Sequence, residues 1–237
     1  MTTELEQIEQ AIHVLDAQRG ILGDAVVDTA LAPLREKLAA LATQGQPHET
    51  KRKLATILFA DVSGFTAMAE KLDAEEVTEL LNALWARLDT AITAHGGQID
   101  KHTGDGVMAI WGADSAREDN PERAVRAALE MQTALASFRP TQNVSLGLRV
   151  GINTGPVLLG EIGSTREFTA MGDAVNLASR LENAAPVGQV LISHDTYRHI
   201  AGLFEVYPQA PLSVKGKREP VQTYLVERAR PHAFRMN

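Results

Sequence analysis

The sequence predicts an α+β fold in which helices cover a mostly antiparallel sheet. Apolar stretches of strand length and two long amphipathic stretches with helical spacing follow one another in the order βαββαβ. Turn sequences rich in glycine join successive strands, as is typical of antiparallel pairs. We therefore expect a ferredoxin-like βαββαβ core that is extended by further elements and preceded by a helical N-terminal segment.

Residues 1–42 predict two helical stretches, separated by Gly20 and Gly23. Pro33 is expected to start or kink a helix, because proline lacks the backbone N–H that a helix interior needs. Both stretches are too short to decide between a hairpin that packs on its own domain and a dimerising coiled coil. The apolar residues at helical spacing are Leu5, Ile8, Ile12 and Leu15 in the first stretch, and Val27, Leu31, Leu34, Leu38 and Leu41 in the second.

The first half of the core begins with a buried strand at Leu54–Ala60, which ends at Asp61 and leads into a tight loop. Asp73 to Glu76 form a capping-box sequence that opens a long helix, and Gly96-Gly97 close it. Two strands, 98–101 and 107–111, then flank a glycine-containing turn at 103–106.

The second half begins with a helix that Asn120-Pro121 start and that runs to about Phe138. We expect a pair of strands, 144–153 and 157–162, to turn at Thr154-Gly155-Pro156. The remaining predicted elements are a short strand near Phe168, a helix over 173–184, a strand at 190–192, a short helix, and a closing strand pair that ends at 224–226.

Composition bounds the function. Of 237 residues, 44% are hydrophobic and 22% charged, which is ordinary for a globular domain. A net charge of -7 without a basic stripe argues against nucleic acid or an anionic membrane as a partner. The absence of cysteine excludes a disulfide framework and a thiolate site, and the chain carries no secretory signal. We expect a cytoplasmic protein.

Two aspartates carry the strongest chemical signal. Taken singly, Asp61 reads as a helix cap and Asp105 as a turn residue. In a βαββ arrangement, however, the first strand lies beside the following hairpin, so the two carboxylates can meet. Two carboxylates together with phosphate oxygens suit magnesium. The backbone N–H groups of the loop formed by Ser63, Gly64, Phe65 and Thr66 suit phosphates. The pattern predicts a two-metal phosphoryl-transfer site.

Several segments also resemble the class III nucleotide cyclase catalytic domain, over about residues 51–228. They are Phe59-Ala-Asp-Val-Ser-Gly-Phe-Thr66, Lys101-His-Thr-Gly-Asp105, Arg149-Val-Gly-Ile-Asn-Thr-Gly155, the 171–182 segment that contains Val-Asn-Leu-Ala-Ser-Arg, and Val214-Lys-Gly-Lys217. The resemblance implies the class III cyclase fold. It further implies that Asp61 and Asp105, helped by the Val62 carbonyl, bind two Mg²⁺ or Mn²⁺ ions per active site.

The resemblance also implies roles for two cations and an amide. Asn176 would position the ribose, and Arg180 would stabilise negative charge at the α-phosphate with its planar guanidinium group. The two lie four residues apart and so share one face of their helix. Lys215 matches the family's triphosphate-binding lysine, with Lys217 as the alternative.

Base choice, by the same resemblance, depends on Lys101 and Thr169. Adenine presents an acceptor at N1 and a donor at N6, and a lysine can only donate whereas a threonine hydroxyl can accept. Lys101 therefore favours ATP over GTP. Because a hydroxyl can also donate, Thr169 leaves some use of GTP open.

The expected function is that of an adenylyl cyclase, which converts ATP to 3′,5′-cyclic AMP and pyrophosphate. The family's domains pair head to tail, so a homodimer of this chain would form two shared sites. A catalytically silent nucleotide-binding domain and a guanylyl cyclase are the alternatives. We assign 1–50 to a helical regulatory or dimerising segment with its linker, 51–228 to the catalytic domain, and 229–237 to a tail.

Overall fold

The protein is described here by a computed structural model, which covers residues 4–17, 19–45, 51–70, 72–138, 146–162, 167–214 and 219–231. The chain divides into two compact units, residues 1–49 and residues 50–237. Among the described residues, no helix is both long enough and apolar enough to cross a membrane.

The N-terminal unit is a helical hairpin. Its first helix packs against its third, and Ile8, Val27 and Leu31 are buried. The third helix continues through Pro33, so this proline does not start a helix as one expectation had it. The side chains of Leu5 and Leu41 lie outside the described residues. The helices are α1 (Glu4–Ala17), α2 (Arg19–Leu22) and α3 (Asp24–Gly45).

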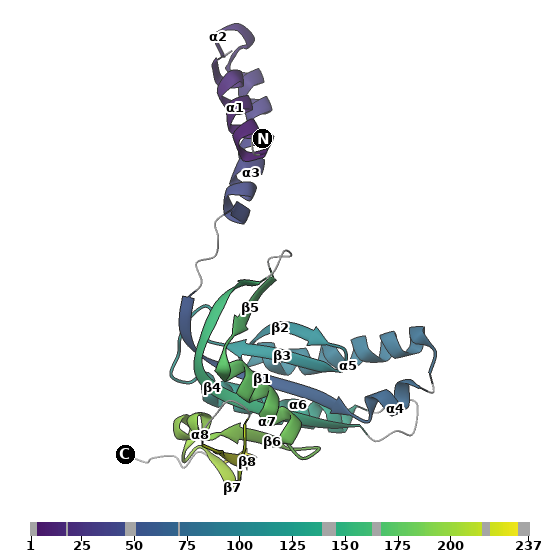
Figure 1. The fold of residues 1–237 in the computed structure, drawn as a ribbon. Helices are drawn as coiled ribbons and strands as arrows, with labels where there is room; N and C mark the ends of the chain where they lie inside the picture. Colours follow the sequence, from purple (N-terminus) through teal and green to yellow (C-terminus); the bar gives the residue numbers. More distant parts are fainter. Residues whose placement is uncertain are drawn as a thin grey trace. The chain divides into compact units, whose positions relative to one another are not determined.

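The second unit contains an eight-stranded sheet with the order β2-β3-β1-β4-β6-β8-β7, and β5 pairs with β4 (Figure 1). Only β4 and β6 run parallel among these pairs in the described chain; the others are antiparallel. The strands are β1 (Lys51–Ser63), β2 (Gln98–Thr103), β3 (Gly106–Trp111), β4 (Gly147–Ile162), β5 (Glu167–Met171), β6 (Val190–Ser193), β7 (Phe204–Leu212) and β8 (Val221–Ala229).

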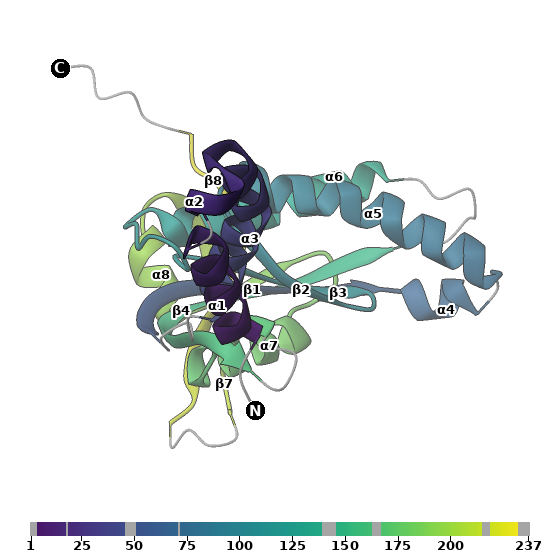
Figure 2. The ribbon, with the colours of Figure 1, turned by 90° about the horizontal axis from the view of Figure 1, so that it is seen from above.

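The predicted βαββαβ core is confirmed. Strands β1 to β4 lie in the order 2-3-1-4, which is the ferredoxin-like order, and two long helices connect them. Figure 2 shows α5 and α6 on one side of the sheet and α7 on the other. The helices of this unit are α4 (Phe65–Ala69), α5 (Ala74–Ala94), α6 (Asn120–Ser137), α7 (Asp173–Ala184) and α8 (His194–Ile200).

The alternation of side chains along β1 divides the core into two faces. Leu58 and Ala60 pack with residues of α5 and α6, whereas Ala55 and Ile57 pack with Ala174 and other residues of the α7 side. Asp61 follows the same alternation as Ala55 and Ile57. Its side chain therefore belongs to the α7 side of the sheet.

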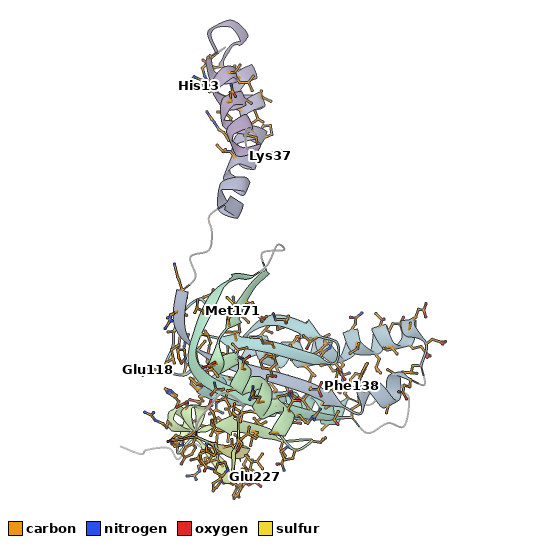
Figure 3. All side chains as sticks on the ribbon, viewed as in Figure 1. His13, Lys37, Glu118, Phe138, Met171 and Glu227 are labelled. Carbon is orange, nitrogen blue, oxygen red and sulfur yellow. The ribbon has the colours of Figure 1, made fainter. Side chains whose placement is uncertain are left out.

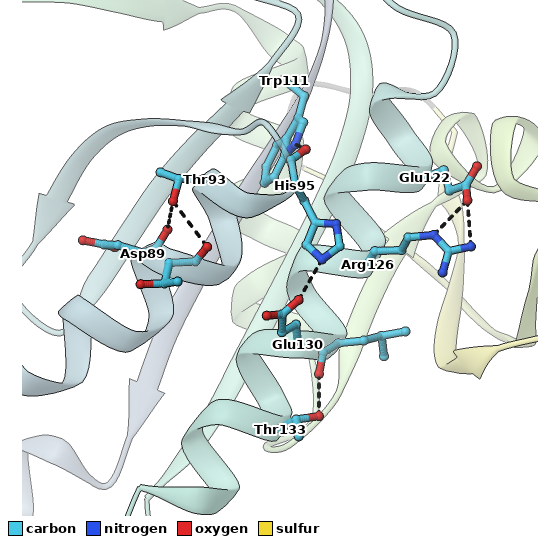
Figure 4. A network of polar contacts seen from close by, with 10 residues as sticks. Asp89, Thr93, His95, Trp111, Glu122, Arg126, Glu130 and Thr133 are labelled. Atoms are coloured by element: carbon cyan, nitrogen blue, oxygen red, sulfur yellow. Dashed lines mark hydrogen bonds and ion pairs between the residues drawn. The ribbon is translucent and has the colours of Figure 1, made fainter.

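Polar contacts tie the two helices of the other side to each other and to the sheet. In Figure 4, His95 at the end of α5 contacts Glu130 of α6, with 2.8 Å between Nε2 and Oε2. The Trp111 indole of β3 donates to the His95 carbonyl at 3.0 Å. Arg87 of α5 lies over the ring of Phe138, 5.3 Å from the ring centroid. Figure 3 labels Phe138, which follows the last residue of α6. The predicted capping box at the start of α5 is present.

One strand assignment was wrong. The two strands predicted about Thr154-Gly155-Pro156 form a single strand, β4, whose register with β1 is continuous from Gly147 to Leu159. Proline is tolerated here because β4 pairs with β6 at 150–152 and with β5 from 158 onward, so Pro156 faces no second strand. Gly155 serves helix packing and not a turn, since a Cβ there would lie 3.0 Å from Ala174 Cβ.

Candidate active site

The structure brings the two predicted metal-binding aspartates together at the β1–β3 pair. Asp61 lies opposite Gly106 in the register of the two strands. The neighbouring Val62 N–H donates to the carbonyl oxygen of Asp105 at 3.0 Å. Asp61 therefore stands next to the residue at the tip of the β2–β3 hairpin, as the sequence predicted. The strand extends further than predicted, so Asp61 and Val62 lie within β1 and not beyond its end.

Arg149 is the cation of this cluster, and the sequence argument had assigned it no role. It faces Asp61 across the β1–β4 pair, and its Nη2 donates to Asp61 Oδ2 at 2.7 Å. This hydrogen bond raises the pKa of the Arg149 guanidinium, so the side chain remains charged. Its membership of the 149–155 motif was the available signal, but only the strand register shows which group it meets.

Glu182 of α7 is the third carboxyl group near Arg149. Its Oε1 lies 3.8 Å from Arg149 Nε, which is too far for a hydrogen bond, and neither atom has another partner in the described chain. The pKa of Glu182 is raised to about 7, chiefly by burial and next by the charge of Asp61, while Arg149 opposes the shift. Burial and the charge of Asp61 also raise the pKa of Asp105.

The cluster thus holds more acidic than basic groups, which is the electrostatic setting that attracts a cation. Within the described residues, no three acidic or histidine side chains are placed to hold one ion by themselves. The pair formed by Asp61 and Asp105 nonetheless fits magnesium or manganese, because such ions are commonly held by one or two carboxylates and complete their shell with water and substrate phosphates.

The predicted phosphate-binding loop is shorter than expected. Ser63 belongs to β1 and pairs with Gly147, while α4 begins at Phe65. The turn between them is reduced to Gly64, whose φ of 89° is in the left-handed region that favours glycine. Phe65 is buried, whereas Gly64 and Thr66 on either side of it are exposed.

The residues predicted to act on the ribose and α-phosphate lie on α7, where Asn176 is exposed and Arg180 half-buried. The helix approaches β4 unusually closely. A Cβ added at Gly151 would lie 2.0 Å from the backbone nitrogen of Glu182, so only glycine allows this packing. The Asn153 amide of β4 also donates to the Ala174 carbonyl at 2.9 Å. Strand β4 therefore sets the position of α7.

The two base-reading candidates lie on β2 and β5, two strands that do not pair with each other, and meet a third residue. Thr169 of β5 donates its hydroxyl hydrogen to Asp100 Oδ2 at 2.7 Å, and Lys101 Nζ of β2 lies 3.3 Å from the same oxygen. The sequence argument missed Asp100. It stands at a register shift in β2 between Ile99 and Lys101. An acidic residue directly before Lys101 in a strand was the only signal.

Within the described ranges, no hydrogen bond or ion pair links the Asp61–Asp105 cluster to the Lys101–Thr169 pair. Lys215 and the alternative Lys217 lie outside the described residues.

Comparison with known proteins shows similarity over most of the chain. The family profile described as "Adenylate and Guanylate cyclase catalytic domain" matches residues 48–228. The adenylate cyclase of Mycobacterium tuberculosis is 34% identical over 175 residues, which are 73% of this chain and 40% of that protein. The chain thus spans about two fifths of the length of this curated relative.

Two solved structures are similar in fold and in sequence. The adenylyl cyclase CyaB from P. aeruginosa superposes with a TM-score of 0.74 at 38% identity, covering 77% of this chain and 97% of that one. The guanylyl cyclase Cya2 gives a TM-score of 0.71 at 34% identity, covering 78% and 97%. The similar proteins include adenylyl and guanylyl cyclases, so similarity by itself does not distinguish adenine from guanine as the base of the substrate.

Proposed function

The chain belongs to the family of adenylate and guanylate cyclase catalytic domains, and we propose that it is an adenylyl cyclase that converts ATP to 3′,5′-cyclic AMP and pyrophosphate. The observation that carries the proposal is the convergence of Asp61 and Asp105, through strand pairing and the Val62-to-Asp105 hydrogen bond, beside a cluster rich in carboxyl groups. Because the substrate is a nucleoside triphosphate, we place the reaction in the cytoplasm.

Members of this family use divalent metal ions. In this chain Asp61, Asp105 and the Val62 carbonyl are the proposed ligands of two Mg²⁺ or Mn²⁺ ions. When bound, such ions acidify the ribose 3′-hydroxyl and neutralise the charge on the leaving pyrophosphate. Arg149 Nη2 donates to Asp61 Oδ2 at 2.7 Å, so the guanidinium offsets the charge of this carboxylate and keeps it oriented.

The other proposed roles belong to side chains that bind and orient the nucleotide. Asn176 holds the ribose, and Arg180 stabilises charge that develops at the α-phosphate. Lys215, or Lys217 in its place, and the backbone of 63–66 bind the triphosphate. Lys101 donates to N1 of adenine, and Thr169 accepts from the N6 amino group.

We place the complete site between two copies of the chain, arranged head to tail. This is supported by the presence of both residue sets in a single sequence, while no hydrogen bond or ion pair joins the two clusters within the described residues. A two-fold homodimer would then contain two active sites, each with Asp61 and Asp105 from one copy and Lys101, Thr169, Asn176 and Arg180 from the other.

The activity is tested directly with purified protein, Mn²⁺ or Mg²⁺, and either ATP or GTP, with the cyclic products resolved by chromatography. Cyclic AMP should form, and Asp61→Ala should reduce its rate at least a thousandfold, since both metals lose a ligand. Asp114→Ala removes an exposed carboxylate that lies three residues beyond the end of β3 and serves as the control. A wild-type protein that binds ATP without forming cyclic AMP would instead favour a silent nucleotide-binding domain.

The shared site is tested by mixing two inactive variants. Asp61→Ala and Arg180→Ala proteins should each be inactive, and a mixture should regain part of the activity through one intact composite site. Differently tagged subunits allow the mixed dimer to be purified. A mixed dimer without activity contradicts the shared-site arrangement.

For the N-terminal unit we propose a regulatory role, supported by its division from the rest of the chain and its hairpin of packed helices. Deletion of residues 1–45 should change the specific activity while residues 51–228 remain folded. Unchanged kinetics would remove this role.

A further inference from the structure

Asp100 is the residue that the structure adds to the base-reading pair. Its side chain is only 3% exposed, and among the described residues two donors approach the same oxygen of its carboxylate. These are the Thr169 hydroxyl at 2.7 Å and the Lys101 ammonium at 3.3 Å. Thr169 is itself 5% exposed. The contact therefore links two strands, β2 and β5, at the two positions on which base choice depends.

A threonine hydroxyl has a single hydrogen and two lone pairs. When that hydrogen is donated to a carboxylate, the oxygen can only accept from any further group. In this structure the hydrogen of Thr169 is donated to Asp100 Oδ2, because a carboxylate is an acceptor and has no hydrogen to offer. The ambiguity of a free hydroxyl, which could donate or accept, is thereby removed.

The two purines differ at the edge that these groups would meet. Adenine offers a donor at N6 and an acceptor at N1, whereas guanine offers an acceptor at O6 and a donor at N1. A hydroxyl restricted to accepting matches N6 and opposes O6. The Lys101 ammonium, which can only donate, matches N1 of adenine and opposes the N1–H of guanine.

We propose that Asp100 determines the specificity for adenine by fixing the Thr169 hydroxyl as an acceptor and holding the Lys101 ammonium beside it. The proposal rests on the function proposed above and deepens it. Asp100 itself does not touch the base; it is a positioning residue that acts through Thr169 and Lys101. Asp100 of β2 thus supplies the negative charge that the neutral hydroxyl of Thr169 lacks.

The test compares kcat/KM for ATP with kcat/KM for GTP in matched variants. Asp100→Ala releases the Thr169 hydroxyl, and the ATP-to-GTP ratio should fall about tenfold, as expected for the loss of one oriented hydrogen bond and the relief of one mismatch. Thr169→Val, which has nearly the same shape but no hydroxyl, should lower the ratio similarly. Thr169→Ser keeps the hydroxyl and should retain the preference.

A double-variant cycle separates positioning from a merely structural role. If Asp100 acts through the Thr169 hydroxyl as well as through Lys101, then Asp100→Ala should lower the ratio by a smaller factor in the Thr169→Val protein than in the wild type. Asp114→Ala is the control, because Asp114 is an exposed carboxylate that accepts a hydrogen bond, at 3.0 Å, from Gln98 of β2, the strand that contains Asp100. Its ratio should equal that of the wild type. Thermal unfolding of each variant identifies those that fail to fold.

Two results would overturn the inference: an unchanged ATP-to-GTP ratio in folded Asp100→Ala, or an equal loss with and without the Thr169 hydroxyl. Either result leaves the cyclase function intact as long as the wild type forms cyclic AMP. If the wild type forms no cyclic product, the proposed function fails. Displacement of a fluorescent ATP analogue by ATP and by GTP then gives the ratio of the two binding affinities for the same variants.

Discussion

Replacing Gly151 by alanine is expected to displace α7 and the nucleotide-binding residues that we assign to it. The added Cβ would lie 2.0 Å from the Glu182 nitrogen and 2.5 Å from the Ala178 oxygen, whereas ordinary contacts begin at 3.4 Å. Both atoms are backbone, so no side-chain rotation relieves the overlap. The helix must move away from β4 by more than 1 Å, since the closest contact falls short of 3.4 Å by that much.

Two measurable effects follow from this displacement. Overpacking of this kind costs about 1–3 kcal/mol or more, and for a protein of this size each kcal/mol lowers Tm by about 2–4 °C. A misplacement of about 1 Å at residues that position a substrate can reduce the rate about a hundredfold. We therefore expect Gly151→Ala to fold with a Tm lower by roughly 5–10 °C and to form cyclic AMP about a hundredfold more slowly.

Gly155→Ala is the matched control, because it lies on the same strand and faces the same helix. Its Cβ would meet Ala174 Cβ at 3.0 Å, an overlap that a shift of a few tenths of an ångström relieves. Calorimetry and cyclic AMP formation should show a far smaller effect than at Gly151. Equal behaviour of the two variants, or a Gly151→Ala protein with wild-type Tm and rate, would refute the argument.

Three further outcomes are expected. The pKa of Glu182 in the folded protein is raised to about 7 from an ordinary 4.5, so its contribution to stability is complete below pH 4.5 and is lost as the pH rises through 7. In urea unfolding with EDTA present, the free energy of unfolding should therefore fall more from pH 5 to pH 8 for the wild type than for Glu182→Gln. Equal falls would contradict this. Thr154→Val should lower the free energy of unfolding, measured with urea, by about 1–3 kcal/mol, because the buried Thr154 hydroxyl is hydrogen-bonded to that of Thr56 at 3.0 Å. Thr133→Val, on the exposed side of α6, should lower it by less than about 0.5 kcal/mol. Mn²⁺ with a non-hydrolysable ATP analogue should raise the Tm of the wild type but not of Asp61→Asn, and a full shift in the variant would argue against Asp61 as a ligand.

The sequence alone was sufficient for the features that depend on local order along the chain. Periodicity of apolar residues predicted the βαββαβ core, and the capping sequence at Asp73 predicted the start of α5. Both are short-range signals, since a helix or strand buries the face that its own spacing creates. The convergence of Asp61 and Asp105 also followed, because the core topology brings a first strand beside the next hairpin.

Other features depend on neighbours that are distant in sequence, and only the tertiary structure decided them. The continuity of β4 through Pro156 depends on the absence of a second strand partner at that residue. The acceptor role of Thr169 depends on Asp100, and the charge balance around Asp61 depends on Arg149 and on burial of Glu182. The spacing of residues along the chain predicts which face of a helix or strand each side chain occupies. The protonation of a side chain, the direction of its hydrogen bonds and its partners depend on the groups that folding places against it.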